Sequence, residues 1–338
     1  MKLKETILLL GKLAVAVLLL VWLQRSGQLD ISQLKRFVSD PYLSLAALLY
    51  FLFCPVLLGT LRWKTLLEGA GYLLNWKRSI QLQMTGFFFN TVMPGAVGGD
   101  IIKIAYVIRD NQGRSKSQAM VTVLLDRIVG LSGLFLVGWL MILTHFEAVS
   151  SQKQLWPIIT LMGGISLGFC IFYTAALYHY KGVDPFSRIL SLSVPGFALL
   201  NKLYTAVRVY RYARSKIIFS IVYSMIIQFC SLLLFYFMTV KVLHSDVPLS
   251  SIATIFPVGI LTTAIPITPG GLGVGHVAFD RLFSIVGLTQ GATIFNLYVL
   301  SSLFFNLFGV IPYLGLKRVP AGPNSDASIQ KNAVISAF

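Results

Sequence analysis

Residues 118–143 read QAMVTVLLDRIVGLSGLFLVGWLMIL, a long apolar run that contains one acidic and one basic side chain, Asp126 and Arg127. A helix needs about 20 mostly apolar residues to cross the roughly 30 Å hydrocarbon core of a bilayer. Five other runs satisfy this length, namely residues 7–23, 41–61, 155–178, 217–240 and 291–316. The sequence therefore predicts an all-α polytopic membrane protein with about six full spans.

The composition is that of a chain surrounded by lipid. Of the 338 residues, 56% are hydrophobic and 12% are charged, whereas a soluble domain has about 25% charged residues. So few charges cannot cover the surface of a soluble protein of this length, which excludes a soluble enzyme, a disordered chain and a disulfide scaffold. No small-residue cleavage site follows the run 7–23, so we expect a retained span rather than a signal peptide.

The net charge of +16 comes from 28 Lys and Arg residues against 12 Asp and Glu residues. In a soluble chain this excess would suggest a nucleic-acid partner. With the N-terminus placed inside, however, 20 of the cations fall in inside segments, 5 in outside segments and 3 within apolar runs. Cytoplasmic loops collect Lys and Arg. We therefore expect a multi-pass protein of the cell (inner or plasma) membrane with both termini cytoplasmic, and no nucleic-acid partner.

Two further apolar stretches, residues 80–108 and 249–288, are interrupted by glycine and proline. The first is broken at residues 93–100 (MPGAVGGD) and the second at residues 267–276 (ITPGGLGVGH), and both contain Pro-Gly-x-aliphatic-Gly. Broken helices in oppositely oriented halves are typical of transporters with inverted repeats. We expect two opposed re-entrant helical hairpins and an inverted repeat. Chance similarity between two glycine-rich loops, or two short crossings at each break, are the alternatives.

Unpaired backbone at membrane depth must be buried in protein or line a wet cavity. A helix that restarts after Gly98 and Gly99 presents free N–H groups and a positive dipole end, which suit an anion such as phosphate. Alternatively, Asp100 is the N-cap of a helix over residues 101–108 and uses these donors itself. Both roles are compatible if a cation such as Lys103 offsets the carboxylate.

Two Asp-Arg pairs, Asp126-Arg127 and Asp280-Arg281, lie within apolar runs. Charges at membrane depth face a bundle interior or a water-filled cavity. Adjacent helical residues point about 100° apart, so each of these side chains is expected to pair with a residue elsewhere. One hypothesis is cross-pairing among Asp100, Arg127, Asp280 and Arg281. The cluster is then either a structural latch between the two halves or a site at which Arg127 and Arg281 contact a lipid phosphate.

Residues 181–216 form a basic loop with an imperfect amphipathic stretch, which is either an interfacial helix on the anionic cytoplasmic leaflet or a plain cytoplasmic loop. The polar segment 317–338 contains Pro320 and Pro323 and is predicted to be a disordered cytoplasmic tail. His276 is expected to be a hydrogen-bonded structural residue; a proton-relay role is the alternative.

Three motifs in order resemble the lysylphosphatidylglycerol synthase transmembrane-region (flippase-like) family. They are residues 90–95 (NTVMPG) leading to Gly98-Gly99-Asp100, then Asp126-Arg127, then residues 269–273 (PGGLG). The resemblance covers about residues 7–316 and implies one integral membrane domain, residues 1–316. In the best-known members this domain translocates aminoacylated phosphatidylglycerol, and a separate soluble domain makes that lipid. About twenty residues follow residue 316, so we expect a stand-alone member without the aminoacyltransferase domain, not a lysyltransferase.

The resemblance implies that the glycines and the aspartate of the family motifs correspond to Gly98, Gly99, Asp100, Gly270, Gly271 and Gly273. Together with the charged residues in or beside the apolar runs, they form the expected substrate-binding set. In the family an acidic residue commonly follows the second glycine-rich run, whereas His276 stands nearby here. The full set is Gly98, Gly99, Asp100, Lys103, Asp126, Arg127, Gly270, Gly271, Gly273, Asp280 and Arg281.

The expected function is a non-enzymatic, flippase-like transport of an anionic or lipid-linked amphiphile, such as an aminoacyl-phospholipid, between leaflets. No cofactor or metal is expected. Two alternatives are open: a non-catalytic membrane partner of a separately encoded lipid-modifying enzyme, docking through residues 181–216, or a membrane-embedded headgroup transferase. The transferase would need a cluster of catalytic side chains, whereas the four histidines are scattered along the chain: His145, His179, His244 and His276.

Overall fold

Helices make up the regular structure of the chain. The computed structural model describes residues 37, 39–92, 98–111, 115–180, 184–191, 197–244, 246–263 and 273–316, and none of these residues lies in a strand. The fold class is that of an all-α polytopic membrane protein, as the sequence predicted. The first predicted span (7–23), Gly270, Gly271 and the predicted tail (317–338) lie outside the described residues.

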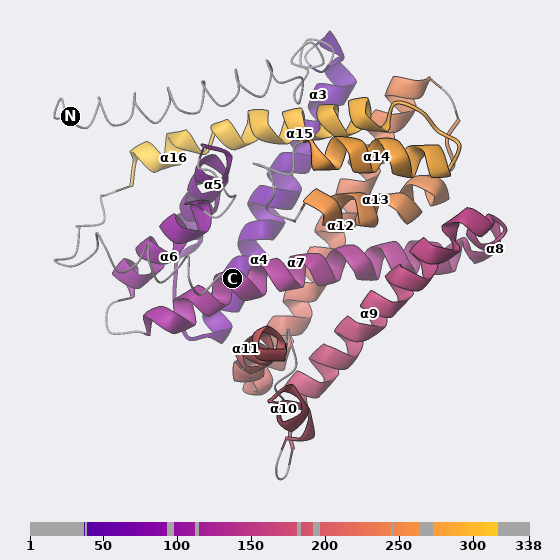
Figure 1. Cartoon of the computed structure of the whole chain (residues 1–338). Helices are drawn as coiled ribbons and strands as arrows, with labels where there is room; N and C mark the ends of the chain where they lie inside the picture. The colour runs from indigo at the N-terminus through magenta and orange to yellow at the C-terminus, as the bar shows by residue number, and fades with distance from the viewer. Residues whose placement is uncertain are drawn as a thin grey trace.

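Five helical segments in the described residues are long and apolar enough to cross a membrane (Figure 1). They correspond to five of the six predicted spans. The first, Pro41–Gly69, joins α3 (Pro41–Phe51), η1 (Leu52–Leu58) and α4 (Gly59–Gly69). The others are α7 (Lys116–Thr144), η2 with α9 (Lys153–Leu155 and Trp156–Leu177), α12 (Arg214–Leu243), and α15 with α16 (Gly291–Leu307 and Val310–Leu314).

The first of these helices continues eight residues beyond the predicted end at residue 61. Its middle segment η1 is a π-helix that contains Pro55. Proline lacks an N–H group and crowds the carbonyl one turn earlier, and a local π segment keeps the helix continuous around it. Because the helix runs to Gly69, Arg62 lies on a helix rather than in a loop.

Both predicted breaks separate two short helices that pack against each other. The first pair is α5 (Trp76–Val92) with α6 (Gly98–Asp110), and the second is α13 (Leu249–Thr263) with α14 (Val274–Ile285). A Cβ added at Gly99 would overlap the carbonyl oxygen of Gly86, so the α5 and α6 backbones touch there. The prediction of two helical hairpins is confirmed, whereas the side from which each enters a membrane stays a prediction.

The order span, hairpin, span occurs twice. The segment α3–α4 precedes the first hairpin and α7 follows it, while α12 precedes the second hairpin and α15 follows it. In Figure 1, α12 runs opposite to α3–α4, and α15 runs opposite to α7. This repeated order with reversed chain direction is what an inverted repeat predicts.

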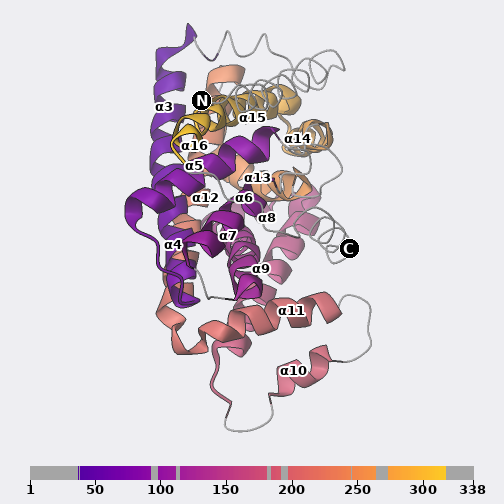
Figure 2. The same ribbon diagram turned by 90° about the vertical axis from the view of Figure 1, so that its left-hand side faces the viewer.

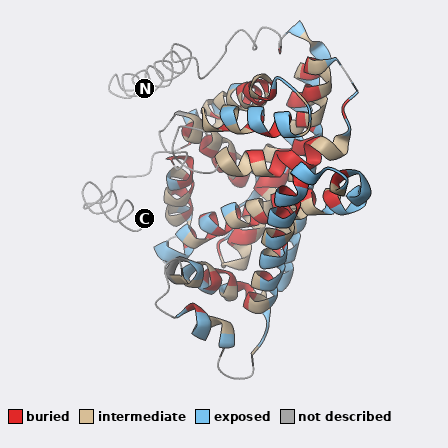
Figure 3. Cartoon of the chain, turned by 45° about the vertical axis from the view of Figure 1, so that its right-hand side comes forward, coloured by how far each residue is buried: buried red, intermediate tan, exposed pale blue. Residues whose placement is uncertain are grey.

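The core gathers where the long helices cross, with exposed residues along the outer faces (Figure 3). Helix α12 packs against both α4 and α7. Phe235 on α12 contacts the rings of Phe256 and Phe279 from the second hairpin and Tyr298 from α15. This aromatic cluster holds the second hairpin against α12. Helix α7 contacts α13 of that hairpin and also contacts α4 and α6.

Between α9 and α12 the chain forms α10 (Pro185–Leu190), α11 (Phe197–Arg208) and η3 (Val209–Tyr212), which lie together at one end of the molecule (Figure 2). The short α8 (Phe146–Ser150) joins α7 to α9. Tyr204 and Val207 on α11 are buried against α9 and α7. The helix expected within 181–216 is therefore present and packs onto the bundle.

Candidate functional site

The adjacent charges on α7 pair with residues of two different helices. Asp126 binds Arg62 of α4, and Arg127 binds Asp100 of α6. Neighbouring helical side chains diverge by about 100°, so one position faces α4 and the next faces α6. The expectation that each charge pairs with a residue elsewhere is confirmed for Asp126 and Arg127.

The Arg62–Asp126 pair is bidentate and largely buried. The distances from Arg62 Nε to Asp126 Oδ1 and from Nη2 to Oδ2 are 2.7 and 3.0 Å. The third nitrogen, Nη1, donates to Ser224 Oγ of α12 at 3.0 Å. Both charged side chains are little exposed, at 13% and 12%. This pair ties α4, α7 and α12 together.

The Arg127–Asp100 pair is unequal in its exposure. Arg127 Nε and Nη2 both donate to Asp100 Oδ2, at 2.8 and 2.6 Å. The Asp100 side chain is 12% exposed, whereas the Arg127 side chain is 48% exposed. A half-exposed guanidinium whose carboxylate partner is buried can exchange that partner for another anion.

Lys103, one turn beyond Asp100 on α6, is buried. Its Nζ donates to Gln83 Oε1 of α5 at 2.9 Å and lies 4.1 Å from the centre of the Trp63 ring. Asp126 and Asp100 are both close enough to attract this ammonium. The Trp63 Nε1 atom is buried and has no hydrogen-bond partner among the described residues.

We call these five ionisable residues the charge cluster: Arg62, Asp100, Lys103, Asp126 and Arg127. It contains three cations and two carboxylates, so it has one excess positive charge when all five groups are ionised. Buried charges are costly unless they are paired. The excess cation and the unpartnered indole N–H together fit an anionic, oxygen-bearing ligand.

The start of α6 differs from the expectation at one position. The helix begins at Gly98, so Asp100 lies inside its first turn and is not its N-cap. The carboxylate instead pairs with Arg127 of α7. The Gly99 N–H donates to Asn90 Oδ1 at 2.9 Å, so this helix terminus does not offer all its donors to a ligand. Gly99 allows the close contact between α5 and α6.

The second break builds a structural turn. Gly273 has a φ of 84°, which favours glycine, and its N–H donates to His276 Nδ1 at 3.2 Å. The other ring nitrogen, Nε2, lies 3.3 Å from Asn296 Oδ1 of α15. His276 therefore fastens the start of α14 to α15, as expected for a structural histidine.

Asp280 and Arg281 lie apart from the charge cluster. Both are exposed on α14, and neither forms an ion pair with any residue that the structure describes. Helix α14 packs against α13 and α15, whereas α6 packs against α5 and α7. Of the hypothesised cross-pairing, the structure contains the Asp100–Arg127 pair and not a pair with Asp280 or Arg281.

Four contributors to this site were not predicted from sequence: Arg62, Trp63, Gln83 and Ser224. Arg62 was assigned to a cytoplasmic segment because the apolar run ends at residue 61. Trp63, Leu66 and Leu67 continue the helical spacing of apolar residues, and this signal could have extended the helix. Within the described ranges, no group of three or more His, Cys, Asp or Glu side chains gathers to hold a metal ion.

Comparison with known proteins places the chain in a family of membrane proteins. The family described as "Lysylphosphatidylglycerol synthase TM region" matches residues 9–309. A UPF0104 membrane protein of Pyrococcus horikoshii is 24% identical over 313 residues, which are 86% of this chain and 90% of that protein. A UPF0104 membrane protein of Methanothermobacter thermautotrophicus is 26% identical over 304 residues, 83% of this chain and 84% of the relative. No solved structure matches the chain.

Proposed function

Because the chain belongs to the lysylphosphatidylglycerol synthase transmembrane-region family, we propose that it moves an anionic or lipid-linked amphiphile between the leaflets of the cell membrane. Membership indicates a role connected with membrane lipids. The proposal adds the transport step and the substrate class, an aminoacyl-phospholipid or a lipid of similar headgroup charge.

The excess positive charge of the charge cluster is the observation that carries this proposal. A lipid phosphate offers oxygen acceptors with the geometry that a guanidinium binds well. Arg127 is half exposed while its partner Asp100 is buried, so a phosphate can reach the guanidinium and compete with that carboxylate. Lys103 lies one turn from Asp100 and carries a further positive charge, and the Trp63 ring beside its Nζ has an indole N–H without a partner among the described residues. The acyl tails remain in lipid throughout.

The repeated span–hairpin–span order provides a route for alternating access. In transporters with inverted repeats, a substrate site near the midplane opens to either side as one repeat moves against the other. The first hairpin carries Asp100 and Lys103, and α7 carries Asp126 and Arg127. Both elements belong to the first repeat, so a movement of the first hairpin against α7 within that repeat would break the Asp100–Arg127 pair and make Arg127 available to the headgroup.

We place both termini in the cytoplasm and assign no catalytic role, cofactor or metal to the chain. One contact supports this sidedness. The Lys216 Nζ of α12 lies 2.6 Å from Glu68 Oε2 at the end of α4. The charge count assigns the cations after the span 41–61 and those of the loop 181–216 to the inside, and a direct contact requires that these two segments lie on one side.

A leaflet-accessibility assay in proteoliposomes tests the proposal. Vesicles with and without the protein would carry fluorescent phosphatidylglycerol, lysyl-phosphatidylglycerol or phosphatidylcholine, and a membrane-impermeant quencher would report the rate of movement to the outer leaflet. We expect the protein to accelerate movement of at least one lipid with a charged headgroup. Rates equal to those of protein-free vesicles for every lipid would contradict transport. They would favour the second candidate, a membrane partner of a separate lipid-modifying enzyme, which co-purification would test.

A further inference from the structure

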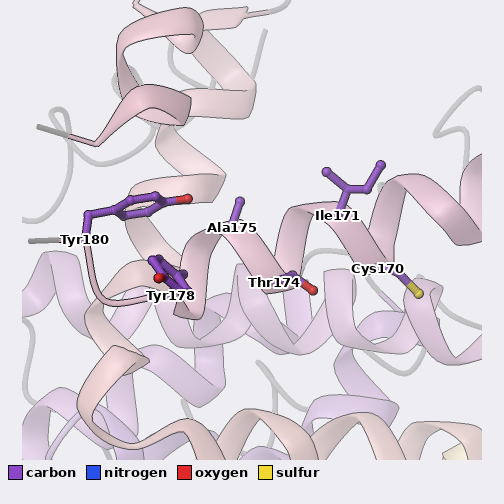
Figure 4. A pocket seen from close by; sticks show the side chains of 6 residues that line it. All are labelled: Cys170, Ile171, Thr174, Ala175, Tyr178 and Tyr180. Atoms are coloured by element: carbon purple, nitrogen blue, oxygen red, sulfur yellow. The ribbon is translucent and has the colours of Figure 1, made fainter.

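The outer face of α9 carries an apolar groove at its C-terminal end. The groove has a volume of about 390 Å³ and is lined by Cys170, Ile171, Thr174, Ala175, Tyr178 and Tyr180 (Figure 4). The lining residues of α9, Cys170 to Ala175, follow helical spacing, so this part of the groove runs along the helix for about 8 Å at 1.5 Å per residue. Among the five long apolar segments, α9 has the smallest buried share. This face is therefore open to whatever surrounds the helix.

The groove ends in a pair of tyrosines. The Tyr178 and Tyr180 rings lie 5.0 Å apart in an edge-to-face arrangement. Tyrosine is enriched where a membrane-spanning helix meets the polar headgroups, because its ring is apolar and its hydroxyl is not. The apolar part of the groove therefore lies on the lipid side of this pair, and the headgroup region begins beside it.

Two arginines lie at the tyrosine end. The guanidinium carbon of Arg208 lies 5.3 Å from the Tyr180 ring centre, and an Arg214 nitrogen contacts His179 Nδ1. Residues 178–216 contain seven Lys and Arg residues and one acidic residue, Asp184. Asp184 is occupied by Arg208 and by the Tyr204 hydroxyl, which donates at 2.8 Å. Burial raises the pKa of Tyr204 to about 12, so this hydroxyl keeps its proton at neutral pH.

We propose that this groove is a binding site for one anionic phospholipid, with an acyl chain along Ile171 and Thr174 and the headgroup phosphate beside Arg214. This site is separate from the charge cluster. An apolar groove alone would accept the acyl chain of any lipid. The basic surroundings at the tyrosine end favour a negative headgroup, because each cation near a headgroup adds attraction for anionic lipid.

Photo-crosslinking tests this site on the purified full chain. The protein would be reconstituted in phosphatidylcholine vesicles that contain a trace of either phosphatidylglycerol or phosphatidylcholine with a photoactivatable acyl chain. We expect phosphatidylglycerol to label the segment 170–180 about fivefold more than phosphatidylcholine does. Equal labelling by the two lipids would overturn the proposal, because the groove would then hold only nonspecific surrounding lipid.

Two variants separate the groove from its headgroup site. Thr174→Trp fills the groove and should abolish labelling of this segment by both lipids, whereas Leu167→Trp on the exposed face of the same helix should not. Arg214→Gln should reduce the preference for phosphatidylglycerol by about fivefold, whereas Lys153→Gln at the other end of the segment should preserve it. If Thr174→Trp fails to fold, the Arg214→Gln result alone decides. An unchanged preference in that folded variant would overturn the proposal.

Discussion

At the scale of single residues, the two ion pairs of α7 differ in what they can do. The Arg62–Asp126 pair is bidentate, and both of its side chains are nearly buried. The Arg127–Asp100 pair converges on one carboxylate oxygen and leaves the guanidinium half exposed. The first arrangement suits a structural latch, and the second suits an exchange of partners.

Removing one member of the buried pair should be costly. Arg62→Gln leaves the Asp126 carboxylate without its counter-charge, and breaking a buried pair in this way costs about 3–5 kcal/mol. We expect the free energy of unfolding in mixed detergent micelles to fall by this amount. The matched control is Arg281→Gln, which removes an exposed arginine that forms no ion pair in the described part of the chain.

The double variant Arg62→Gln/Asp126→Asn tests the cause. If the loss comes from the uncompensated carboxylate, the second substitution should recover most of it, since a double-mutant cycle isolates the interaction between contacting residues. A loss in Arg62→Gln no larger than in Arg281→Gln would show that the pair does not stabilise the fold.

Sequence rules predicted the site in part. Asp126 and Arg127 stand out because charges in an apolar run are costly, and their divergence follows from helix geometry. Arg62 does not stand out in the sequence, because it directly follows the end of an apolar run. Gln83 and Ser224 are uncharged polar residues, and nothing in the sequence around them indicates a role. Their contribution depends on how α4, α5 and α12 pack, which is set by contacts distant in sequence.

At the scale of helices, the first hairpin depends on the close approach of α5 and α6. Gly99 faces the Gly86 backbone with no room for a side chain, and the Gly99 N–H is bonded to Asn90. The glycines at this break therefore have a packing role, in addition to the break itself. Proline and glycine act on their own backbone, so the positions of both breaks were predictable. The contact between Gly99 and Gly86 was not, because it joins two helices.

Gly99→Ala should separate these helices. Overpacking of this kind costs about 1–3 kcal/mol, and the shift should also weaken the Lys103–Gln83 hydrogen bond that joins the same helices. Gly164→Ala is the matched control, because an added Cβ there meets nothing within 4 Å, and its effect should stay within about 1 kcal/mol. Equal stability of the two variants in a denaturant titration would rule out tight packing at this contact.

At the scale of the whole molecule, the charge distribution and the repeated helix order describe the same architecture. Both predict that the two hairpins enter from opposite sides, and the charge distribution predicts which side is cytoplasmic, with the segment between α9 and α12 on the side that collects cations. Five of six predicted spans and both hairpins are present in the described residues. Periodicity and length predict such elements well, whereas the sidedness rests on charge alone and needs its own measurement.

Cysteine accessibility provides that measurement. In a Cys170→Ser background, Ser151→Cys and Ser191→Cys place exposed thiols in the α8–η2 turn and after α10. A membrane-impermeant maleimide should label Ser151→Cys in right-side-out vesicles and Ser191→Cys only in inside-out vesicles. Labelling of both from the same side would refute the predicted arrangement of spans.

The central claim is that Arg127 binds the headgroup of a transported lipid. The most direct test is the rate of lipid movement between leaflets in proteoliposomes that contain wild type, Arg127→Gln or Arg281→Gln, each checked for folding. We predict that Arg127→Gln slows the protein-dependent movement at least about tenfold, since a hydrogen bond to a charged group contributes roughly 1.5–3 kcal/mol, and that Arg281→Gln keeps the wild-type rate. Movement at the wild-type rate in folded Arg127→Gln would contradict the claim.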